Sequence, residues 1–220
     1  MTTITPSEAI EAVRKNLDEQ EINAAALYPT GSPDTSDNDS LDSIIRKTLP
    51  EAINAVQAEA PLALIEGVAG SPTGASFSNN VLAFSFTTAQ ILRLVAFQSV
   101  DSAVVLGEWT PEYSPEGRKQ LDTYVRGTYD DPVLVKIQGK QQFRYYTVLP
   151  ATATTYASAP ASAVARFDYV PLQTYAAAAV SYSVADLLKE SALLHLTGMV
   201  LAIYGEADKA QYFFNKAKIQ

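Results

Sequence analysis

Apolar residues recur at helical spacing close to the start of the chain. The segment Thr5-Pro6-Ser7-Glu8 combines a capping threonine, a proline at the first helical position and a glutamate three residues after the cap. Ile10, Val13 and Leu17 then follow at intervals of three and four residues, which is typical of one buried helix face. The pattern predicts a helix from about residue 6 to residue 20.

A second apolar stripe follows residues 29–40, whose turn-forming composition predicts an exposed loop. The stripe lies on one helix face and consists of Leu41, Ile44, Ile45, Leu49, Ile53 and Val56. Pro50 interrupts it, because proline removes a hydrogen-bond donor and crowds the preceding turn. We therefore expect a kink or a restart near Thr48, where Thr48–Glu51 has the composition of a second capping box.

Short runs of β-forming residues replace the helical period after Gly67. A loop predicted at residues 71–80 precedes six predicted strands, at residues 81–86, 91–97, 103–106, 133–137, 142–148 and 164–170. The two runs on either side of Gln138-Gly139-Lys140 predict a hairpin. Residues 150–163 are mostly small, which predicts an extended connector or a mobile loop.

The helical period returns after Pro171 and continues to Gly205, which we expect to cap one helix before a last helix over Glu206–Lys218. The order of helices, strands and helices predicts an α+β fold: an antiparallel bundle of N- and C-terminal helices with a central β-rich insertion. The predicted parts are residues 1–68, 69–170 and 171–220. A length of 220 residues fits one domain with an insertion or two small domains.

Composition indicates a globular chain without covalent staples. Hydrophobic residues make up 47% of the sequence, which is enough to bury a core, and cysteine is absent, which excludes disulfides and thiolate metal sites. The first twenty residues do not have the pattern of a secretory signal. The most apolar stretch, Ser191–Tyr204, is too short to span a bilayer, so we expect no membrane association.

The negative charge is concentrated in the first third of the chain. The net charge is −8, and residues 1–68 hold 12 acidic and 4 basic side chains, whereas residues 69–220 hold 12 of each. We expect an acidic face that includes Glu8, Glu11, Asp18 and Glu19, together with Glu21 and the loop from Asp34 to Asp42. An acidic surface does not gain affinity for a phosphate backbone, so DNA can pass nearby without specific binding.

Residues suited to catalysis or metal binding are sparse. His195 is the single histidine, and it lies within an apolar helical run, which favours a packing role. The aspartates between residues 34 and 42 do not fit a calcium loop, because Asp42 and Thr48 occupy positions that need glycine and an acid. Glu108 and Glu112 form a carboxylate pair of the kind that arises often by chance. We expect no enzyme activity, no cofactor and no metal.

Consecutive aromatic residues near the end of the chain indicate an interaction surface. Successive helical residues point about 100° apart, so a run of three aromatic residues cannot face one core. At least one of them should contact another surface. The candidate assembly residues here are Tyr212, Phe213, Phe214, Lys216 and Lys218. Arg126 is a further candidate in the region 111–146, where basic and aromatic residues alternate and favour protein contact or single-strand binding.

Three groups of short motifs resemble a known family. They are Leu41–Ala52 with Ala60-Pro61; Leu92–Val95 with Ser114-Pro115-Glu116, Arg126-Gly127 and Asp131-Pro132; and Gly205–Ala210 with Phe213–Ala217. In this order they resemble head-to-tail connector (adaptor or ring) proteins of tailed phages, particularly of crAss-like and other Bacteroides phages. The resemblance covers most of residues 40–220.

The resemblance implies a structural virion protein, made in the host cytoplasm, that forms a ring of about twelve copies below the portal protein. Such a ring joins the portal to further tail or ring proteins and lines part of the channel for DNA. The acidic face is then either a channel wall that repels DNA or an ordinary solvated face. Two alternatives remain: another structural phage protein, such as a tail or head-fibre component, and a module that binds glycans or peptides.

Overall fold

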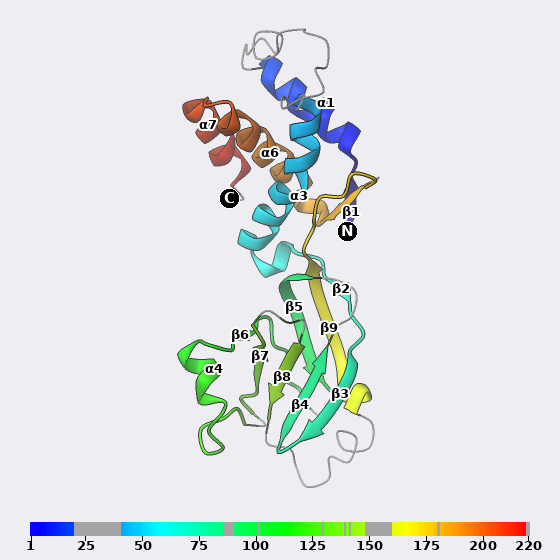
Figure 1. Ribbon diagram of the computed structural model, residues 1–220, viewed down its shortest axis with the longest axis vertical. Helices are drawn as coiled ribbons and strands as arrows, with labels where there is room; N and C mark the ends of the chain where they lie inside the picture. Colours follow the sequence, from blue (N-terminus) through cyan, green and yellow to red (C-terminus); the bar gives the residue numbers. More distant parts are fainter. Residues whose placement is uncertain are drawn as a thin grey trace. The chain divides into compact units, whose positions relative to one another are not determined.

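The first and last segments of the chain come together in one unit, and the middle segment forms another (Figure 1). The helical unit comprises Met1–Ile65 and Gln173–Gln220, and the β unit comprises Glu66–Leu172. The structure is a computed structural model that describes residues 1–19, 41–85, 90–100, 102–128, 130–138, 140, 142–147, 160–179 and 181–218. The predicted loop at residues 29–40 and residues 150–159 of the predicted connector lie outside the described residues.

Four α-helices make up most of the helical unit: α1 (Pro6–Glu19), α3 (Leu41–Glu59), α6 (Lys189–Ile203) and α7 (Ala207–Ala217). The helix α6 is central, because it contacts α1, α3 and α7. Two short 3-10 turns, η1 (Leu62–Leu64) and η3 (Asp186–Leu188), flank α3 and α6. The helices bury aliphatic side chains such as Val13, Ile45, Ile53, Leu196 and Leu201.

The helix ends confirm two sequence predictions. At the start of α1, the Glu8 backbone N–H donates to Thr5 Oγ1 at 3.2 Å, as the capping pattern predicts. After α6, Gly205 has φ +80°, and the Glu206 N–H donates to the Leu201 carbonyl at 3.0 Å. This six-to-one hydrogen bond is the Schellman arrangement that favours glycine at this position.

We expected a kink or a restart near Thr48. The helix α3 runs through Pro50 without a break, so the restart is wrong. The Thr48 hydroxyl donates to the Ile44 carbonyl one turn earlier, at 2.6 Å. Thr48 therefore behaves as a residue inside a helix and not as a cap.

A small antiparallel sheet also belongs to the helical unit. The strand β1 (Thr2–Ile4) pairs with β10 (Tyr182–Val184), and Ile4 and Val184 are both fully buried. Nearby, the Asn54 side chain of α3 holds the Gln173 backbone: its Nδ2 donates to the Gln173 carbonyl at 2.7 Å, and its Oδ1 accepts from the Gln173 N–H at 2.9 Å. These contacts connect the first and last chain segments.

The β unit contains two sheets. A three-stranded antiparallel sheet has the order β2 (Val68–Ala69), β9 (Val164–Pro171), β5 (Ile91–Ser99). A five-stranded sheet has the order β3 (Thr73–Ser78), β4 (Val81–Ser85), β8 (Gln142–Tyr146), β7 (Val133–Lys136), β6 (Thr110–Pro111), in which only β6 and β7 are parallel. The helix α4 (Pro115–Lys119) and the turn η2 (Pro160–Ala163) complete the unit.

Aromatic rings from both sheets form the core of the β unit. Phe84 stacks on Phe97 and Phe143, with centroid distances of 5.6 and 5.7 Å. Phe167 meets Phe143 edge-on at 5.5 Å, and Tyr145 lies 4.9 Å from Phe97. Because β5 and β9 supply two of these rings and β4 and β8 supply the others, the two sheets bury one face of each against the other.

The predicted fold class, an α+β antiparallel helix bundle with a central β-rich insertion, is wrong. The described chain is a mixed α/β protein, with about 41% helix and 28% strand, ten strands in three sheets and five α-helices. The helical unit itself holds two of the strands, β1 and β10. Strands of two or three residues are too short to show a period of two, so the sequence pattern misses them.

The edges of the β unit also correct the sequence prediction. The strand β3 lies where a loop was expected, and it pairs with β4 through a turn in which Asn79 and Asn80 have φ of 51° and 60°. Asparagine tolerates this conformation, which suits a tight hairpin. The predicted strand at 103–106 is reduced to one bridge between Leu106 and Phe97, whereas the predicted β7–β8 hairpin is confirmed.

Candidate interaction surfaces

The three consecutive aromatic residues of α7 lie in different surroundings. Phe213 is buried in the helical unit, Phe214 is half-buried, and Tyr212 is 48% exposed. Lys216 and Lys218 are exposed beside it. Tyr212 is therefore the aromatic residue of this helix that is presented to solvent.

His195 lies where α6 meets α7. Its ring centroid is 4.9 Å from that of Phe214. Burial lowers the pKa of His195, and the negative charge of Glu59 opposes this shift. Gly198, one turn further along α6, allows this close approach, because an added Cβ would lie 2.7 Å from the Phe214 ring. The contacts of His195 are those of a packing residue.

The predicted acidic face is only partly described. Glu8 Oε1 lies 2.6 Å from Lys189 Nζ, so this carboxylate forms an ion pair between α1 and α6. Glu11 is exposed on α1. Asp18 and Glu19 belong to α1, but their side chains lie outside the described part of the chain. Of the four candidates, Glu11 is the one whose side chain is described and forms no ion pair with a base in the described part of the chain.

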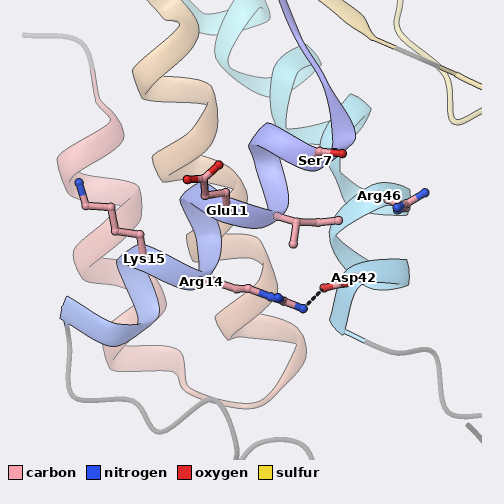
Figure 2. A pocket seen from close by; sticks show the side chains of 7 residues that line it. Ser7, Glu11, Arg14, Lys15, Asp42 and Arg46 are labelled. Atoms are coloured by element: carbon pink, nitrogen blue, oxygen red, sulfur yellow. Dashed lines mark hydrogen bonds and ion pairs between the residues drawn. The ribbon is translucent and has the colours of Figure 1, made fainter.

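An open groove of about 690 Å³ lies between α1 and α3 (Figure 2). Its lining residues are Ser7, Ile10, Glu11, Arg14, Lys15, Asp42 and Arg46. Arg14 and Asp42 point toward one another and form an ion pair of 2.8 Å, while Lys15 and Arg46 point to opposite sides in Figure 2. The groove thus mixes acids and bases on an open surface, which suits a polar protein contact.

The segment from Ser114 to Gly127, which we call the α4 loop, exposes three apolar side chains. It includes α4 and lies beside β6 and β7 (Figure 1). Leu121 is 69% exposed, Tyr124 is 96% exposed and Val125 is 58% exposed. Exposed apolar side chains close together in the sequence are a common feature of protein contact surfaces.

Hydrogen bonds hold the α4 loop at its start, middle and end. Ser114 Oγ accepts from the Gly117 N–H at 3.0 Å and caps α4. The buried Gln120 accepts from the Gly127 N–H at 2.7 Å, and Arg126 Nη1 donates to the Asn79 carbonyl at 2.7 Å. The exposed apolar side chains are therefore presented by a fixed backbone.

A groove of about 340 Å³ runs beside the α4 loop on the outer face of β3, β4 and β8; we call it the arginine groove. Arg126 and Arg144 line it together with Tyr146, small side chains of β3 and β4, and Leu121. No acidic side chain is among the described residues that line it. The groove is the clearest cationic hollow among those described here.

A second cluster on the β unit is structural. The Lys136 ammonium lies 4.3 Å from the Trp109 ring centroid, and burial lowers the pKa of Lys136. Glu112, a member of the carboxylate pair singled out in the sequence, accepts from the Gln138 N–H at 3.3 Å. These contacts connect β6 and the hairpin end of β7.

The described residues also bear on metal binding and on membranes. Within the described ranges, no group of three or more His, Cys, Asp or Glu side chains is placed to hold a metal ion. No helix in that part of the chain is long and apolar enough to cross a bilayer.

Sequence reasoning found only part of these surfaces. It identified Arg126 and the basic–aromatic region, and the structure places Arg126 in the arginine groove. It missed the apolar pair Leu121 and Val125, because isolated apolar residues in a turn-rich segment have no period. The only sequence signal for Leu121 and Val125 is that they belong to no helical or strand pattern that would bury them.

Comparison with known protein families, curated proteins and solved structures gives no match for this chain.

Proposed function

We propose that this chain is a structural virion protein that assembles into a ring of about twelve copies in the head-to-tail connector of a tailed phage. The ring contacts the portal protein on one side and further tail or ring proteins on the other. The motif resemblance supplies the location. The observation that carries the assembly role is that each unit exposes an apolar surface of its own.

The two apolar surfaces lie in different units of the chain. In the β unit, the α4 loop exposes Leu121, Tyr124 and Val125. In the helical unit, Ile203 at the end of α6 and Tyr212 of α7 are exposed large hydrophobic residues. Leu187 is 71% exposed, but it lies before the opposite end of α6. Exposed large apolar side chains are a common feature of protein contact sites.

Two unlike surfaces on one chain favour head-to-tail association. Contacts between different patches repeat from copy to copy, and they close into a ring when the rotation between neighbours closes. A groove of about 370 Å³ next to Ile203, lined also by Met199 and Phe214, offers room for an apolar side chain of a neighbour.

The test measures the mass of the purified full-length chain, alone and with its portal protein, by native mass spectrometry and negative-stain imaging. We expect one ring size. Tyr124→Ser and Tyr212→Ser should each shift the population toward monomer. Tyr175→Ser is the matched control, because Tyr175 is also exposed but belongs to neither surface. A chain that stays monomeric with and without the portal overturns the proposal.

The acidic face extends the same proposal to the DNA channel. Acidic side chains repeated around a ring repel DNA, whereas basic ones retain it through counterion release. Glu11→Lys is the informative change, because Glu8 is already paired with Lys189. Slower genome ejection from intact particles supports a channel wall, and unchanged ejection restricts this face to solubility.

A further inference from the structure

We propose that the arginine groove of the β unit binds a carboxylate-bearing protein segment, with an acidic side chain seated between Arg126 and Arg144. This site goes beyond ring formation and does not depend on it. The groove lies entirely within the β unit.

The first observation is the state of Arg126. Its Nη1 donates to the Asn79 carbonyl at 2.7 Å, and its Nη2 donates to Thr123 Oγ1 at 3.1 Å. Both acceptors are neutral, so they fix the guanidinium without cancelling its charge. Each terminal nitrogen carries two N–H groups, so one donor on each is left for a ligand.

The second observation is the state of Arg144. Its Nη1 lies 3.9 Å from Glu112 Oε1, which is an ion pair beyond hydrogen-bonding distance. Such a partly exposed pair contributes little and is easily exchanged. Arg144 can therefore donate to a carboxylate that enters the groove, and guanidinium–carboxylate pairs are among the stronger hydrogen-bonded contacts in proteins.

The strands below the arginine groove explain why a side chain of a ligand can fit into it. Ser76, Ala83 and Arg144 lie side by side across three strands, and so do Ser78, Val81 and Tyr146. The small side chains of β3 and β4 leave the space of about 340 Å³ above them. The hydroxyl groups of Ser76 and Ser78 in β3 add donors to the lining of the groove.

The rim favours a polypeptide over an inorganic anion. Leu121 lines the groove and is exposed, so an apolar side chain beside the carboxylate gains contact area there. Arg126 is tied to the β3–β4 turn, which keeps its charge in a fixed position, while Arg144 is free to turn toward a ligand. One fixed and one adjustable cation beside an apolar rim suit an acidic residue next to an aliphatic one.

The test uses two blocked peptides, one of alternating Leu and Glu and one with Gln in place of every Glu. Binding to the isotope-labelled full-length chain is followed by NMR at the arginine side-chain N–H groups and the Asn79 amide. We expect saturable binding of the acidic peptide, and binding of the Gln peptide that is weaker by about tenfold or more, because charge-assisted bonds are lost.

Two variants separate the site from general electrostatics. Arg144→Gln should weaken binding of the acidic peptide by about tenfold. Arg118→Gln removes the same charge from an exposed position outside the groove, and it should leave binding unchanged.

Several results would overturn the proposal. They are the absence of saturable binding, equal binding of both peptides, equal loss in the two variants, or displacement of the peptide by an equal concentration of inorganic phosphate. Ring formation is measured separately. A variant that no longer binds the peptide but still forms rings leaves the proposed function intact. A chain that binds the peptide but stays monomeric with and without the portal overturns the proposed function and leaves the peptide site intact.

Discussion

The helical unit buries mainly aliphatic side chains, whereas the β unit buries a cluster of aromatic rings. The helical unit carries 15 acidic and 8 basic residues, a net charge of −7, and the β unit carries 9 and 8, a net charge of −1. The net negative charge of the chain therefore belongs almost wholly to the helical unit. The unit that is nearly neutral overall is also the one with the cationic groove.

Both units bury polar side chains, but in the helical unit one buried amide has no partner among the described residues. The helical unit buries Gln57 completely, and neither its amide oxygen nor its amide nitrogen has a partner in the described structure. It also buries Thr197, whose hydroxyl accepts from Asn16 Nδ2 at 2.9 Å. The stability of the helical unit should therefore depend most on close packing and on hydrogen-bond partners for its buried polar groups. The stability of the β unit should depend most on the buried area of its aromatic rings.

The strongest test of this contrast is Phe143→Ala. Truncating a buried phenylalanine costs about 3–5 kcal/mol of unfolding free energy. Trp109 is the single tryptophan and lies 5.8 Å from Phe143, so its fluorescence reports the β unit. We expect urea unfolding by fluorescence to move to lower urea, with the helical circular dichroism transition unchanged.

The reciprocal control is Phe213→Ala in α7. It should move the helical transition and leave the Trp109 signal in place. If each variant shifts both transitions together, the two units unfold as one, and the contrast between them has no thermodynamic meaning.

Gly198→Ala tests the close approach of α6 and α7. The added Cβ would lie 2.7 Å from the Phe214 ring. Overpacking of this kind lowers the free energy of unfolding by about 1–3 kcal/mol. The better helix propensity of alanine offsets up to about 1 kcal/mol of this loss. We expect a net loss in thermal stability. In a Phe214→Leu background the loss should disappear, and a loss that persists there would place the strain elsewhere.

Gln57→Leu tests the buried amide. Replacing an unpartnered buried polar group by an apolar one of similar size should stabilise the helical unit by about 1–2 kcal/mol. Thr197→Val is the opposite case, because it breaks the bond with Asn16 and should cost about 1 kcal/mol. Destabilisation by Gln57→Leu, measured by chemical denaturation, would contradict this account of the helical core.

His195 gives the smallest predicted effect, through pH. Burial lowers its pKa below 6.5, so between the two pKa values the unfolded chain binds more protons than the folded chain. Unfolding free energy should therefore fall as the pH drops below about 6.5 and level off below the folded pKa.

The measurement follows the NMR signal of the single histidine across pH. Glu59→Gln should lower the pKa of His195 further, because the Glu59 charge raises it. His195→Gln should flatten the pH dependence in this window. A folded pKa above 6.5 would be inconsistent with the described packing.

The sequence predicts elements well where one local signal determines them. The cap at Thr5, the glycine at Gly205 and the β7–β8 hairpin each follow from a few neighbouring residues. The fold class failed because β1 and β10 lie far apart in sequence and form only by pairing with each other. A pattern within one segment carries no information on such a partner.

The candidate site shows the same limit. Arg126 stands out in the sequence as a charged residue among tyrosines, but the arginine groove needs Arg144 and the turn at Asn79 as well. These residues become neighbours only through the register of β3, β4 and β8. The positions of Leu121 and Val125 depend on the Gln120 bond that closes the α4 loop.

The pairing of β1 with β10 also dictates an order of events during synthesis on the ribosome. The β unit is one continuous stretch and has all its strands once Leu172 has emerged. The helices α1 and α3 emerge earlier and can pack against each other, but they need α6 and β10 to bury the rest of their apolar faces. The growing chain therefore exposes apolar surface on α1 and α3 while the β unit folds. This interval is when the chain offers the most apolar surface to a chaperone.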